Sequence, residues 1–477
     1  MKICSSQSVR IAEQELFASG AMSSLQLMNA VIDRMWSACR SEPLLRGFVP
    51  QRVVVYAGTG NNAGDAIGLA ARWGCPVTLR CAGSLSADAQ AQLCGREEYE
   101  PVSPQEGLLI IDGLLGSGAV GELRPAYAAL VQELNALRAA SPRSLTLAID
   151  IPTGLDAATG THGAEVVLAD ATAAIGCVKP GLLAEDAVGR LLCIPLPEVG
   201  ELPAADSAGV ATAEALSPLL PRRAYSCFKN RAGRVAIVAG SVGMAGAAQM
   251  CAEAALAAGA GLVVLYCMPP VYPILAARVA PEIMVRPVGS YADIHEPDAQ
   301  ALVIGPGLGE VQPVAAESLR RLASEFAGTV VLDADGLNTA AANRWQAQSN
   351  WVLTPHPGEM RRLDPRPATT RRETVARYLE QHDCVLLLKG ARTIVADRTG
   401  TLYNSTGGPY MANGGQGDVL AGTIGALAAQ GLSPFRAAAT GALACGLAAE
   451  AAWSAAGYPH AIRATDVIRH LPVALSR

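Results

Sequence analysis

An α/β fold with parallel sheets covered by helices is the fold class that this sequence predicts, and three observations predict it. Short runs rich in Val, Ile and Leu alternate with Ala-rich helical stretches along the chain. Many of these runs end in Gly or Asp, as strands of open α/β sheets do where they bind ligands. Of the 477 residues, 51% are hydrophobic and 17% are charged, so a well-folded core is expected.

The predicted secondary structure follows these runs in order. Residues 9–36 have apolar side chains at helical spacing, and this helix is expected to pack on the first sheet or on a partner subunit. Residues 254–277 are uncharged, but Gly and Pro interrupt them, so helix, turn and strand are expected there instead of a membrane span. The predicted strands cover residues 52–56, 76–80, 107–112, 145–150, 234–240, 262–266, 301–305, 329–333 and 384–390.

A change in composition predicts where one domain ends and the next begins. Residues 194–229 are rich in proline and mixed polar residues, unlike the regular segments on either side. At roughly 100 to 200 residues per domain, a chain of this length holds two or three domains. We therefore expect one domain over residues 1–210 and a second over residues 211–477.

Composition also excludes several classes of function. The net charge of -5 and the 4% aromatic content speak against a nucleic-acid partner and against an anionic membrane surface. Twelve scattered cysteines without a C-x-x-C pair predict buried thiols, not disulfides or zinc. The first residues lack an apolar signal region, so a cytoplasmic protein is expected.

In the first half, polar residues crowd the turn after the first predicted strand. Residues 58–63 fit G-x-G-x-x-A, a weak dinucleotide-binding signal, since no ribose-binding acid follows at the usual distance. Asn61, Asn62 and Asp65 fall in the first helical turn after it, where such side chains either cap a helix or hold a ligand.

Two further strand ends carry similar chemistry. Asp112 closes a strand and precedes a loop that contains Gly116 and Gly118, whose amides can line an anion site. Asp150 closes the next strand, and Thr153 follows three residues later. A hard cation prefers carboxylate, hydroxyl and carbonyl oxygens, whereas zinc usually takes thiolate or imidazole ligands, which are missing from these motifs. The residues therefore favour potassium over zinc.

The second half predicts a nucleotide and phosphoryl site from several glycine-rich turns. Residues 240–249 open an Ala-rich helix after a strand, and residues 305–309 read GPGLG after another. Residues 331–338 place Asp333 and Asp335 at a strand end, where carboxylates suit Mg²⁺ or its waters, although both are also common helix caps.

The sharpest signal is the sequence GGPYMANGGQGDVLAG at residues 407–422. Residues 414–418 contain three glycines and end in Asp418, and a long apolar helix follows. Backbone amides and the helix N-terminus can bind an activated phosphate, while Asp418 can deprotonate a substrate hydroxyl as a base. The remaining alternative is a simple N-cap.

Two other segments of the second half contain candidate ligand-binding residues. His356 lies in the turn Thr-Pro-His-Pro-Gly-Glu-Met at residues 354–360. Lone histidines are usually structural, but this one lies in a constrained, glycine-containing turn, so a structural and a functional role are both open. Lys389 to Thr393 follow an apolar strand, so a cation and a hydroxyl are expected near a nucleotide phosphate.

The first-half motifs together resemble the YjeF N-terminal domain, the NAD(P)H-hydrate epimerase family, over roughly residues 5–205. The resemblance rests on GTGNNAGD, DGLLGSG, DIPTGLD and VKPGL. It implies a Rossmann-like three-layer sandwich, potassium held by Asn62, Asp112 and Thr153, and a catalytic role for Asp150. The family usually shows NNGGDG, so the Cβ at position 63 is expected to hinder close backbone approach or a positive φ. The implied substrate contacts are Asn61, Asn62, Ala63, Gly64, Asp65, Gly116, Gly118 and Asp150.

The second-half motifs resemble the YjeF C-terminal domain, the ADP-dependent NAD(P)H-hydrate dehydratase of the ribokinase-like superfamily, over roughly residues 222–477. This resemblance implies a three-layer α/β/α domain, ADP or alternatively ATP as the nucleotide, and Mg²⁺. The implied contacts with the hydrated nucleotide are Ala247, Gly307, His356 and Asp418. The implied contacts with the adenine nucleotide are Lys389, Gly390, Ala391, Arg392, Thr393 and Gly417.

The two resemblances together predict a fused repair enzyme with NADHX and NADPHX as substrates, and a homo-oligomer. One unit would interconvert the R and S hydrates at C6, and the other would remove water from the S hydrate at the expense of ADP. Three alternatives remain: a ribokinase-like small-molecule kinase with an accessory domain, an NADP-dependent redox enzyme, and a non-catalytic binding module in the first half.

Overall fold

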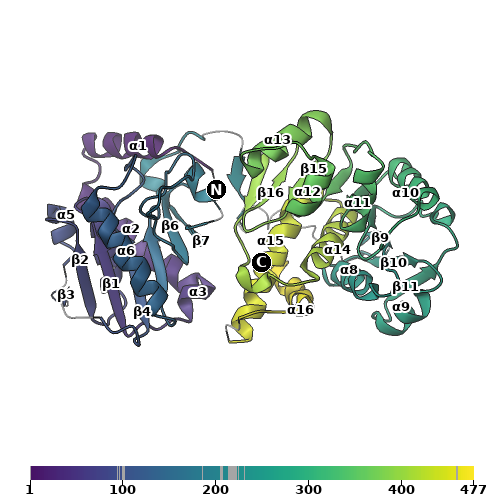
Figure 1. Cartoon of the computed structure of the whole chain (residues 1–477), viewed down its shortest axis with the longest axis horizontal. Coiled ribbons are helices and arrows are strands. Elements are labelled where there is room, and N and C mark those ends of the chain that lie inside the picture. Colours follow the sequence, from purple (N-terminus) through teal and green to yellow (C-terminus); the bar gives the residue numbers. More distant parts are fainter. Residues whose placement is uncertain are drawn as a thin grey trace. The chain divides into compact units, whose positions relative to one another are not determined.

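The computed structural model divides the chain into two compact units, Met1–Val210 and Ala211–Arg477. Figure 1 shows that each unit is built around its own sheet with helices beside it. Cys94 and residues 213–222 of the proline-rich segment lie outside the described residues. The structure describes residues 2–93, 95, 97–98, 102–184, 186–204, 208–212, 223, 225–229, 231–457 and 460–476.

The first unit alternates helices and strands for most of its length, as the sequence pattern predicts. Its elements are α1 (Ser6–Ala18), α2 (Ser24–Ser41), α3 (Pro43–Arg46), β1 (Arg52–Ala57), α4 (Asn61–Ala71), β2 (Val77–Cys81), α5 (Ala87–Gln90), β3 (Glu97–Glu98), β4 (Leu108–Gly113), α6 (Pro125–Ala140), β5 (Leu145–Ile149), β6 (Ala171–Gly176), η1 (Pro180–Leu183), β7 (Arg190–Pro195), η2 (Pro197–Val199) and β8 (Ala208–Val210).

The sheet of the first unit is parallel and has the strand order β3-β2-β1-β4-β5-β6-β7. Apolar side chains of α2 and α4 pack on one face, and Val131 and Leu134 of α6 pack on the other, which gives three layers. The strand order reverses between β1 and β4, and ligands of open α/β sheets bind at such a point. The turns after β1, β4 and β5 therefore meet where a ligand site is expected.

The second unit follows the same alternation and ends in three long helices. Its elements are β9 (Arg234–Val238), α8 (Ala245–Ala257), β10 (Leu262–Cys267), α9 (Tyr272–Arg278), β11 (Ile283–Pro287), η4 (Tyr291–Asp293), β12 (Ala301–Ile304), α10 (Pro313–Glu325), β13 (Thr329–Leu332), α11 (Asp335–Ala342), β14 (Trp351–Leu353), α12 (Pro357–Leu363), α13 (Arg371–Gln381), β15 (Val385–Leu388), β16 (Thr393–Ala396), β17 (Thr401–Asn404), η5 (Pro409–Met411), α14 (Gln416–Ala429), α15 (Pro434–Ala455) and α16 (Ala464–Ala474).

The sheet of the second unit runs β11-β10-β9-β12-β13-β14-β15-β16-β17. Strands β11 to β15 are parallel, and the buried side chains of α8, α14, α15 and α16 cover one face of the sheet. Many of these buried residues are alanines, so the helices pack closely on the strands and on one another. The carboxyl ends of β9, β12, β13 and β15 lie along one edge.

Two differences between the structure and the sequence prediction concern residues 9–36 and the strands that follow β15. Residues 9–36 form two helices instead of one, because Ser23 begins α2 with a capping box to Gln26. Strands β16 and β17 run antiparallel to their neighbours, whereas the alternating pattern predicted parallel strands only. The loop between β15 and β16 is too short for the crossover that a parallel connection needs.

Within the described ranges, no helix combines the length and the apolar character needed to cross a bilayer. Eleven cysteines are free thiols, seven of them buried.

Candidate active sites

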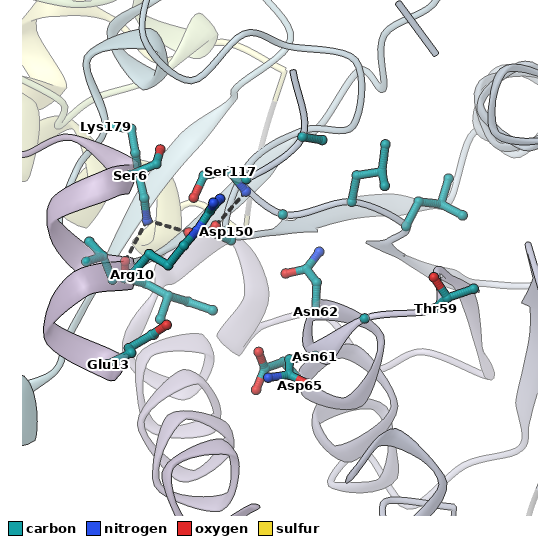
Figure 2. Close-up of a pocket in the computed structure, with 18 of the residues that line it drawn as sticks. Ser6, Arg10, Glu13, Thr59, Asn61, Asn62, Asp65, Ser117, Asp150 and Lys179 are labelled. Atoms are coloured by element: carbon teal, nitrogen blue, oxygen red, sulfur yellow. Dashed lines mark hydrogen bonds and ion pairs between the residues drawn. The ribbon is translucent and has the colours of Figure 1, made fainter. Parts of the chain in front are cut away.

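In the first unit, the residues predicted at three strand ends line one cavity of about 520 Å³. Asn61, Asn62 and Asp65 reach it from the first turns of α4, and Asp150 reaches it from the end of β5. The glycine loop after β4 forms another wall with Gly116 and Gly118. Figure 2 shows these side chains around the hollow.

Asp150 is held in an unusual backbone conformation at the edge of this cavity. Its φ of 66° lies in the left-handed region, which costs a non-glycine residue on the order of 1–3 kcal/mol. Its Oδ2 accepts a hydrogen bond from the Ser117 amide at 2.8 Å, and its Oδ1 pairs with the Lys179 ammonium. Burial alone would raise the pKa of Asp150, but Lys179 and Ser117 hold this pKa below its usual value. Asp150 is therefore an anion fixed in place.

Asp65 and Glu13 have the opposite tendency in the same cavity. Burial, followed by the negative charges of Asp150 and Glu13, raises the pKa of Asp65 well above its ordinary value. The Oδ1 atom of Asp65 is buried and has no hydrogen-bond partner in the described structure. Burial and the charge of Asp150 also raise the pKa of Glu13, although Lys179 and Arg10 counteract this. The cavity thus combines a carboxylate whose pKa is lowered with two carboxyl groups whose pKa values are raised.

Of the three predicted potassium ligands, Asn62 lines this cavity, and Asp112 and Thr153 are hydrogen-bonded to each other. Asp112 is buried, and its carboxylate accepts hydrogen bonds from the Thr153 amide at 2.7 Å and the Thr153 hydroxyl at 2.8 Å. Burial raises the pKa of Asp112 to about 6, despite the bonds from Thr153 and Leu114 that lower it. No cationic side chain among the described residues pairs with Asp112, and the Asn62 amide nitrogen is buried without a partner. Such a set of oxygen donors fits a monovalent cation.

The position of Ala63 overturns one expectation. Ala63 lies inside α4 with helical backbone and is fully buried, so no positive φ is needed there. The other alanine that replaces a family glycine, Ala66, packs against Gly113, which leaves room for its methyl group. The predicted hindrance at position 63 was therefore wrong for the backbone, because helix α4 begins before this residue.

Several polar residues that line this cavity were not predicted from the sequence, among them Ser6, Arg10, Glu13 and Lys179. Ser6, Arg10 and Glu13 come from α1, and Lys179 follows β6. Lys179 had a usable signal, because it is one of two lysines in the first 210 residues and follows an apolar run. The α1 residues had none, since an amphipathic helix does not reveal what its polar face covers.

In the second unit, a buried ion pair connects three of the predicted segments. Asp333, at the end of β13, accepts hydrogen bonds from the Lys389 ammonium and the Thr354 hydroxyl, both at 2.8 Å. The Lys389 ammonium also lies 3.7 Å from Glu359. Burial alone would lower the pKa of Lys389, but Asp333 and Glu359 raise it, so the ammonium stays charged.

Helix α14 begins directly against this ion pair. A Cβ atom on Gly417 would lie 3.2 Å from the Lys389 ammonium and 3.5 Å from an oxygen of Asp333, so the start of the helix lies in contact with both members of the pair. Gly415 caps the helix with a φ of 95°, which favours glycine. Asp418 therefore lies in the first turn of α14, beside the ion pair.

Asp418 has the pKa expected of a general base. Burial and the negative charges of Asp333, Asp335 and Glu359 raise the pKa of Asp418 to about 7, although Lys389 lowers it. A carboxylate whose pKa lies near neutrality can accept a proton and return it. The N-cap alternative is not supported, because Gly415 occupies the cap and Asp418 is the third residue of the helix.

The glycine loops that the sequence singled out lie next to one another. The Ser241 hydroxyl donates to the Gly307 carbonyl at 2.9 Å, and a Cβ on Gly307 would lie 3.0 Å from the Cβ of Ala247. Asp335 accepts a hydrogen bond from the Gly309 amide at 2.7 Å. Ala334, which lies between Asp333 and Asp335 after β13, has a strained φ of 47°.

The His356 side chain caps helix α12 and is also exposed to solvent. Its Nδ1 accepts hydrogen bonds from the amides of Gly358 at 2.9 Å and Glu359 at 3.3 Å, so the ring caps α12. A neutral ring with Nδ1 as acceptor carries its proton on Nε2. The side chain is 52% exposed, so Nε2–H remains available to a ligand.

The segment from Lys389 to Thr393 is arranged differently from the expectation of a free cation and hydroxyl. Lys389 is committed to Asp333, the Arg392 side chain is buried, and the Thr393 hydroxyl donates to the Gly390 carbonyl at 3.0 Å. Arg371 of α13, which sequence reasoning missed, donates to the carbonyls of Leu388, Lys389 and Arg392. The backbone at Gly390 and Ala391 is exposed.

Two α/β units, each with ionised and protonatable carboxyl groups at the carboxyl ends of parallel strands, define an enzyme of the nucleotide-handling α/β class. Family models match both units: NAD(P)H-hydrate dehydratase over residues 235–473, and YjeF-related protein N-terminus over residues 22–181. The chain belongs to the family of bifunctional NAD(P)H-hydrate repair enzymes, which confirms the predicted family, fold class and enzymatic repair function.

Curated relatives and a solved structure illustrate the match. The Bifunctional NAD(P)H-hydrate repair enzyme Nnr of Coxiella burnetii is 34% identical over 89% of this chain and 90% of its own length. The protein of that name from Escherichia coli is 35% identical over 93% and 88%. A ribokinase-like superfamily protein from Enterococcus faecalis shares the fold with a TM-score of 0.51 and 24% identity, over 58% of this chain and 98% of its own.

Proposed function

We propose that the first unit interconverts the R and S hydrates of NADH and NADPH at C6, and that the second dehydrates the S hydrate with ADP as phosphoryl donor. The observation that supports this most directly is Asp418, a carboxyl group with a pKa of about 7 in the first turn of α14. This arrangement matches a base beside a phosphate-binding helix terminus.

In the proposed dehydration, Asp418 accepts the proton of the C6 hydroxyl while that oxygen takes up a phosphoryl group. The backbone amides at the start of α14 stabilise the negative charge on the transferring group. ADP becomes AMP, and the new phosphate leaves C6 with the electron pair of the C6–O bond. Loss of the C5 proton to water then forms the C5–C6 double bond and restores the dihydronicotinamide. Lys389 balances the charge of Asp333 beneath this site, and Ala247, Gly307 and His356 are proposed to contact the hydrated nucleotide.

Proposed cation sites follow from the oxygen donors in each unit. Asp333 uses Oδ1 for its contacts with Lys389 and Thr354, so its Oδ2 is proposed to face Mg²⁺ or its waters. Asp335 accepts at Oδ2 from the Gly309 amide and, at 3.4 Å, at Oδ1 from the Asn338 side chain, so it is proposed to act through a bound water. In the first unit, Asn62, Asp112 and Thr153 are proposed to hold K⁺. A bound cation supplies positive charge that orients nucleotide phosphates or polarises the substrate carboxamide.

The experiment that tests the proposal uses the full chain and a mixture of hydrate epimers, with and without ADP. We expect complete conversion to NADH when ADP is present, and interconversion of the epimers without it. The Asp150→Ala variant should stop consumption of the R hydrate and spare the S hydrate. Accumulation of a stable phosphorylated product would instead indicate a small-molecule kinase, and conversion of only the S hydrate would leave the first unit without epimerase activity.

Several finer statements remain predictions. They are the nucleotide contacts of Gly390, Ala391, Arg392, Thr393 and Gly417, the choice between ADP and ATP, a homo-oligomeric state and a cytoplasmic location. Exposed backbone at Gly390 and Ala391 supports the first of these, whereas the buried Arg392 side chain does not. Nucleotide binding by the Ala391→Pro variant would test the loop, because proline changes this backbone without removing a charge.

A further inference from the structure

The cavity of the first unit holds one carboxylate fixed by an ammonium group and an amide, Asp150, and one carboxyl group with a buried oxygen that has no hydrogen-bond partner, Asp65, and this difference carries an inference about how epimerisation proceeds. The inference rests on the proposed function of this unit. The charged residues lining the cavity are Arg10, Glu13, Asp65, Asp150 and Lys179, and Tyr127 of α6 is the further titratable group. These groups come from α1, α4, α6, the end of β5 and the turn after β6, and the loop after β4, which also lines the cavity, contributes no titratable side chain.

Asp150 is built to remain ionised. Its two oxygens contact the Lys179 ammonium and the Ser117 amide, and Lys179 is itself buried, with a second hydrogen bond of 2.6 Å to the Ile175 carbonyl. Figure 2 shows both contacts of Asp150. Because the lysine lies in a fixed position, it keeps the charge on Asp150 and orients this carboxylate toward the cavity.

Asp65 lines the same cavity, but neither an ammonium group nor a backbone amide is seen to contact its buried oxygen in the described part of the chain. Neither a cation nor a hydrogen-bond donor is recorded at its buried Oδ1, within the part of the chain that the structure describes. Its nearest charged neighbours are acidic, namely Asp150 and Glu13, so a negative charge on Asp65 is disfavoured. A buried carboxyl group without donors that faces other carboxylates holds its proton at neutral pH.

One neutral and one ionised carboxyl group in a single cavity are the combination that cleaves a C–O bond at a carbon next to a heteroatom. The neutral group protonates the departing oxygen, and the anion stabilises the cation that remains. In the hydrate, C6 carries the hydroxyl and is bonded to the ring nitrogen N1, whose lone pair can form such a cation. Epimerisation then requires only that water return to the other face.

We propose that Asp65 donates the proton that releases the C6 hydroxyl as water, that Asp150 stabilises the ring cation, and that Glu13 of α1 is a positioning residue that keeps the proton on Asp65. The C6–O bond breaks with its electron pair on oxygen, which takes the Asp65 proton, while the N1 lone pair forms a double bond to C6. A water molecule adds to the opposite face, the double-bond pair returns to N1, and the excess proton returns to Asp65. No other reactant is consumed.

The inference assigns a function to α1, which precedes the residues matched by the family model of this unit. This helix is anchored next to the site, because the Cys4 amide donates to the Val178 carbonyl at 3.1 Å and Val9 packs with Cys177. Lys179 follows Val178 directly. The segment that brings Glu13 to the cavity is thus attached to the turn that holds the partner of Asp150.

The first test measures epimerisation of the R hydrate by the full chain in water enriched in oxygen-18. Product epimer should carry the heavy oxygen at C6, and the Asp65→Asn variant should be slower by about a hundredfold or more. Wild-type turnover in Asp65→Asn, or a product that retains its original oxygen, would overturn the proposal. An inactive wild-type protein would instead refute the epimerase function itself.

The second test separates the role of Glu13 from a structural one. Glu13→Gln removes a negative neighbour, so the pKa of Asp65 should fall. The rate should then decline at a lower pH than in the wild type, while its value at lower pH is retained. Glu15→Gln, an exposed change on the same helix, is the matched control and should leave the profile unchanged. An identical pH profile for Glu13→Gln and Glu15→Gln would exclude Glu13 as a positioning residue.

Discussion

At the end of β5 in the first unit, the Lys179 ammonium pairs with Asp150, and at the end of β13 in the second unit Lys389 pairs with Asp333. Each pair lies near a further carboxyl group whose pKa is raised, Asp65 in one unit and Asp418 in the other. Two unrelated sheets thus use the same electrostatic arrangement. A carboxylate with its own lysine stays charged, and its negative charge helps a second carboxyl group keep a proton.

The difference between the two sites lies in what surrounds the protonatable carboxyl group. Asp65 faces a cavity of about 520 Å³ whose walls include side chains of α1. Asp418 instead lies at the beginning of α14, where glycines expose backbone amides. Side-chain walls suit an uncharged ring that must present both of its faces, whereas backbone donors suit a transferring phosphoryl group. The groups around the protonatable carboxyl, side chains in one unit and backbone amides in the other, therefore distinguish the two reactions more than the carboxyl groups do.

The largest expected effect separates the two units by function. Asp418→Asn should slow ADP-dependent dehydration by about a hundredfold to ten-thousandfold, because the base is lost while the side-chain shape is kept. Epimerisation in the same polypeptide should be unchanged. Recovery of the near-ultraviolet absorbance of NADH measures the first activity, and chromatographic separation of the epimers measures the second. Normal dehydration by the variant would remove Asp418 from the mechanism.

The next prediction compares the two lysines. Lys389→Met should lower the free energy of unfolding by about 3–5 kcal/mol, because it leaves the Asp333 carboxylate buried without a cation. Lys179→Met should cost less, because the Asp150 side chain is 14% exposed against 2% for Asp333, and water can reach it. Denaturant titration measures both, and exposed Lys2→Met serves as control. A larger loss for Lys179→Met would contradict the difference in burial.

The pH dependence of the two activities should have opposite signs. Asp418 acts in its ionised form, so dehydration should decline as the pH falls below about 7. Asp65 acts in its protonated form, so epimerisation should decline as the pH rises through its raised pKa. Glu359→Gln keeps an oxygen for the His356 amide but removes a charge, so the dehydration limb should shift to lower pH. If both activities changed with pH in the same direction, the proposed opposite protonation states of Asp418 and Asp65 would be wrong.

The smallest expected effect concerns the alanine that departs from the family pattern. Ala63→Gly should destabilise the first unit by roughly 1 kcal/mol or less, because glycine weakens a helix and this position is already helical. The epimerisation rate should not increase. Thermal unfolding and initial rates measure the two quantities. A several-fold faster variant would show that the methyl group, which the structure places in the buried interior of α4, hinders the substrate after all.

The sequence predicted the strands that carry the two sites because burial in a parallel sheet demands continuous apolar runs, and glycine and aspartate mark their ends. All nine predicted strands correspond to strands of the structure, among them β1, β4 and β5 in the first unit and β13 and β15 in the second. Strands such as β6 and β11 were missed. The run from Ala171 to Gly176 is rich in alanine, which is equally typical of helices.

The sequence by itself determined the residue types at the strand ends and the glycines that let backbone approach a ligand, because these requirements are local. Only the tertiary structure decided which charges meet: that Lys389 pairs with Asp333 across 56 positions of sequence, that Glu13 faces Asp65, and that Asp150 is the carboxylate kept ionised. The protonation state of a carboxyl group depends on its burial and on charged neighbours that folding brings close, and the spacing of residues within one segment predicts neither of them.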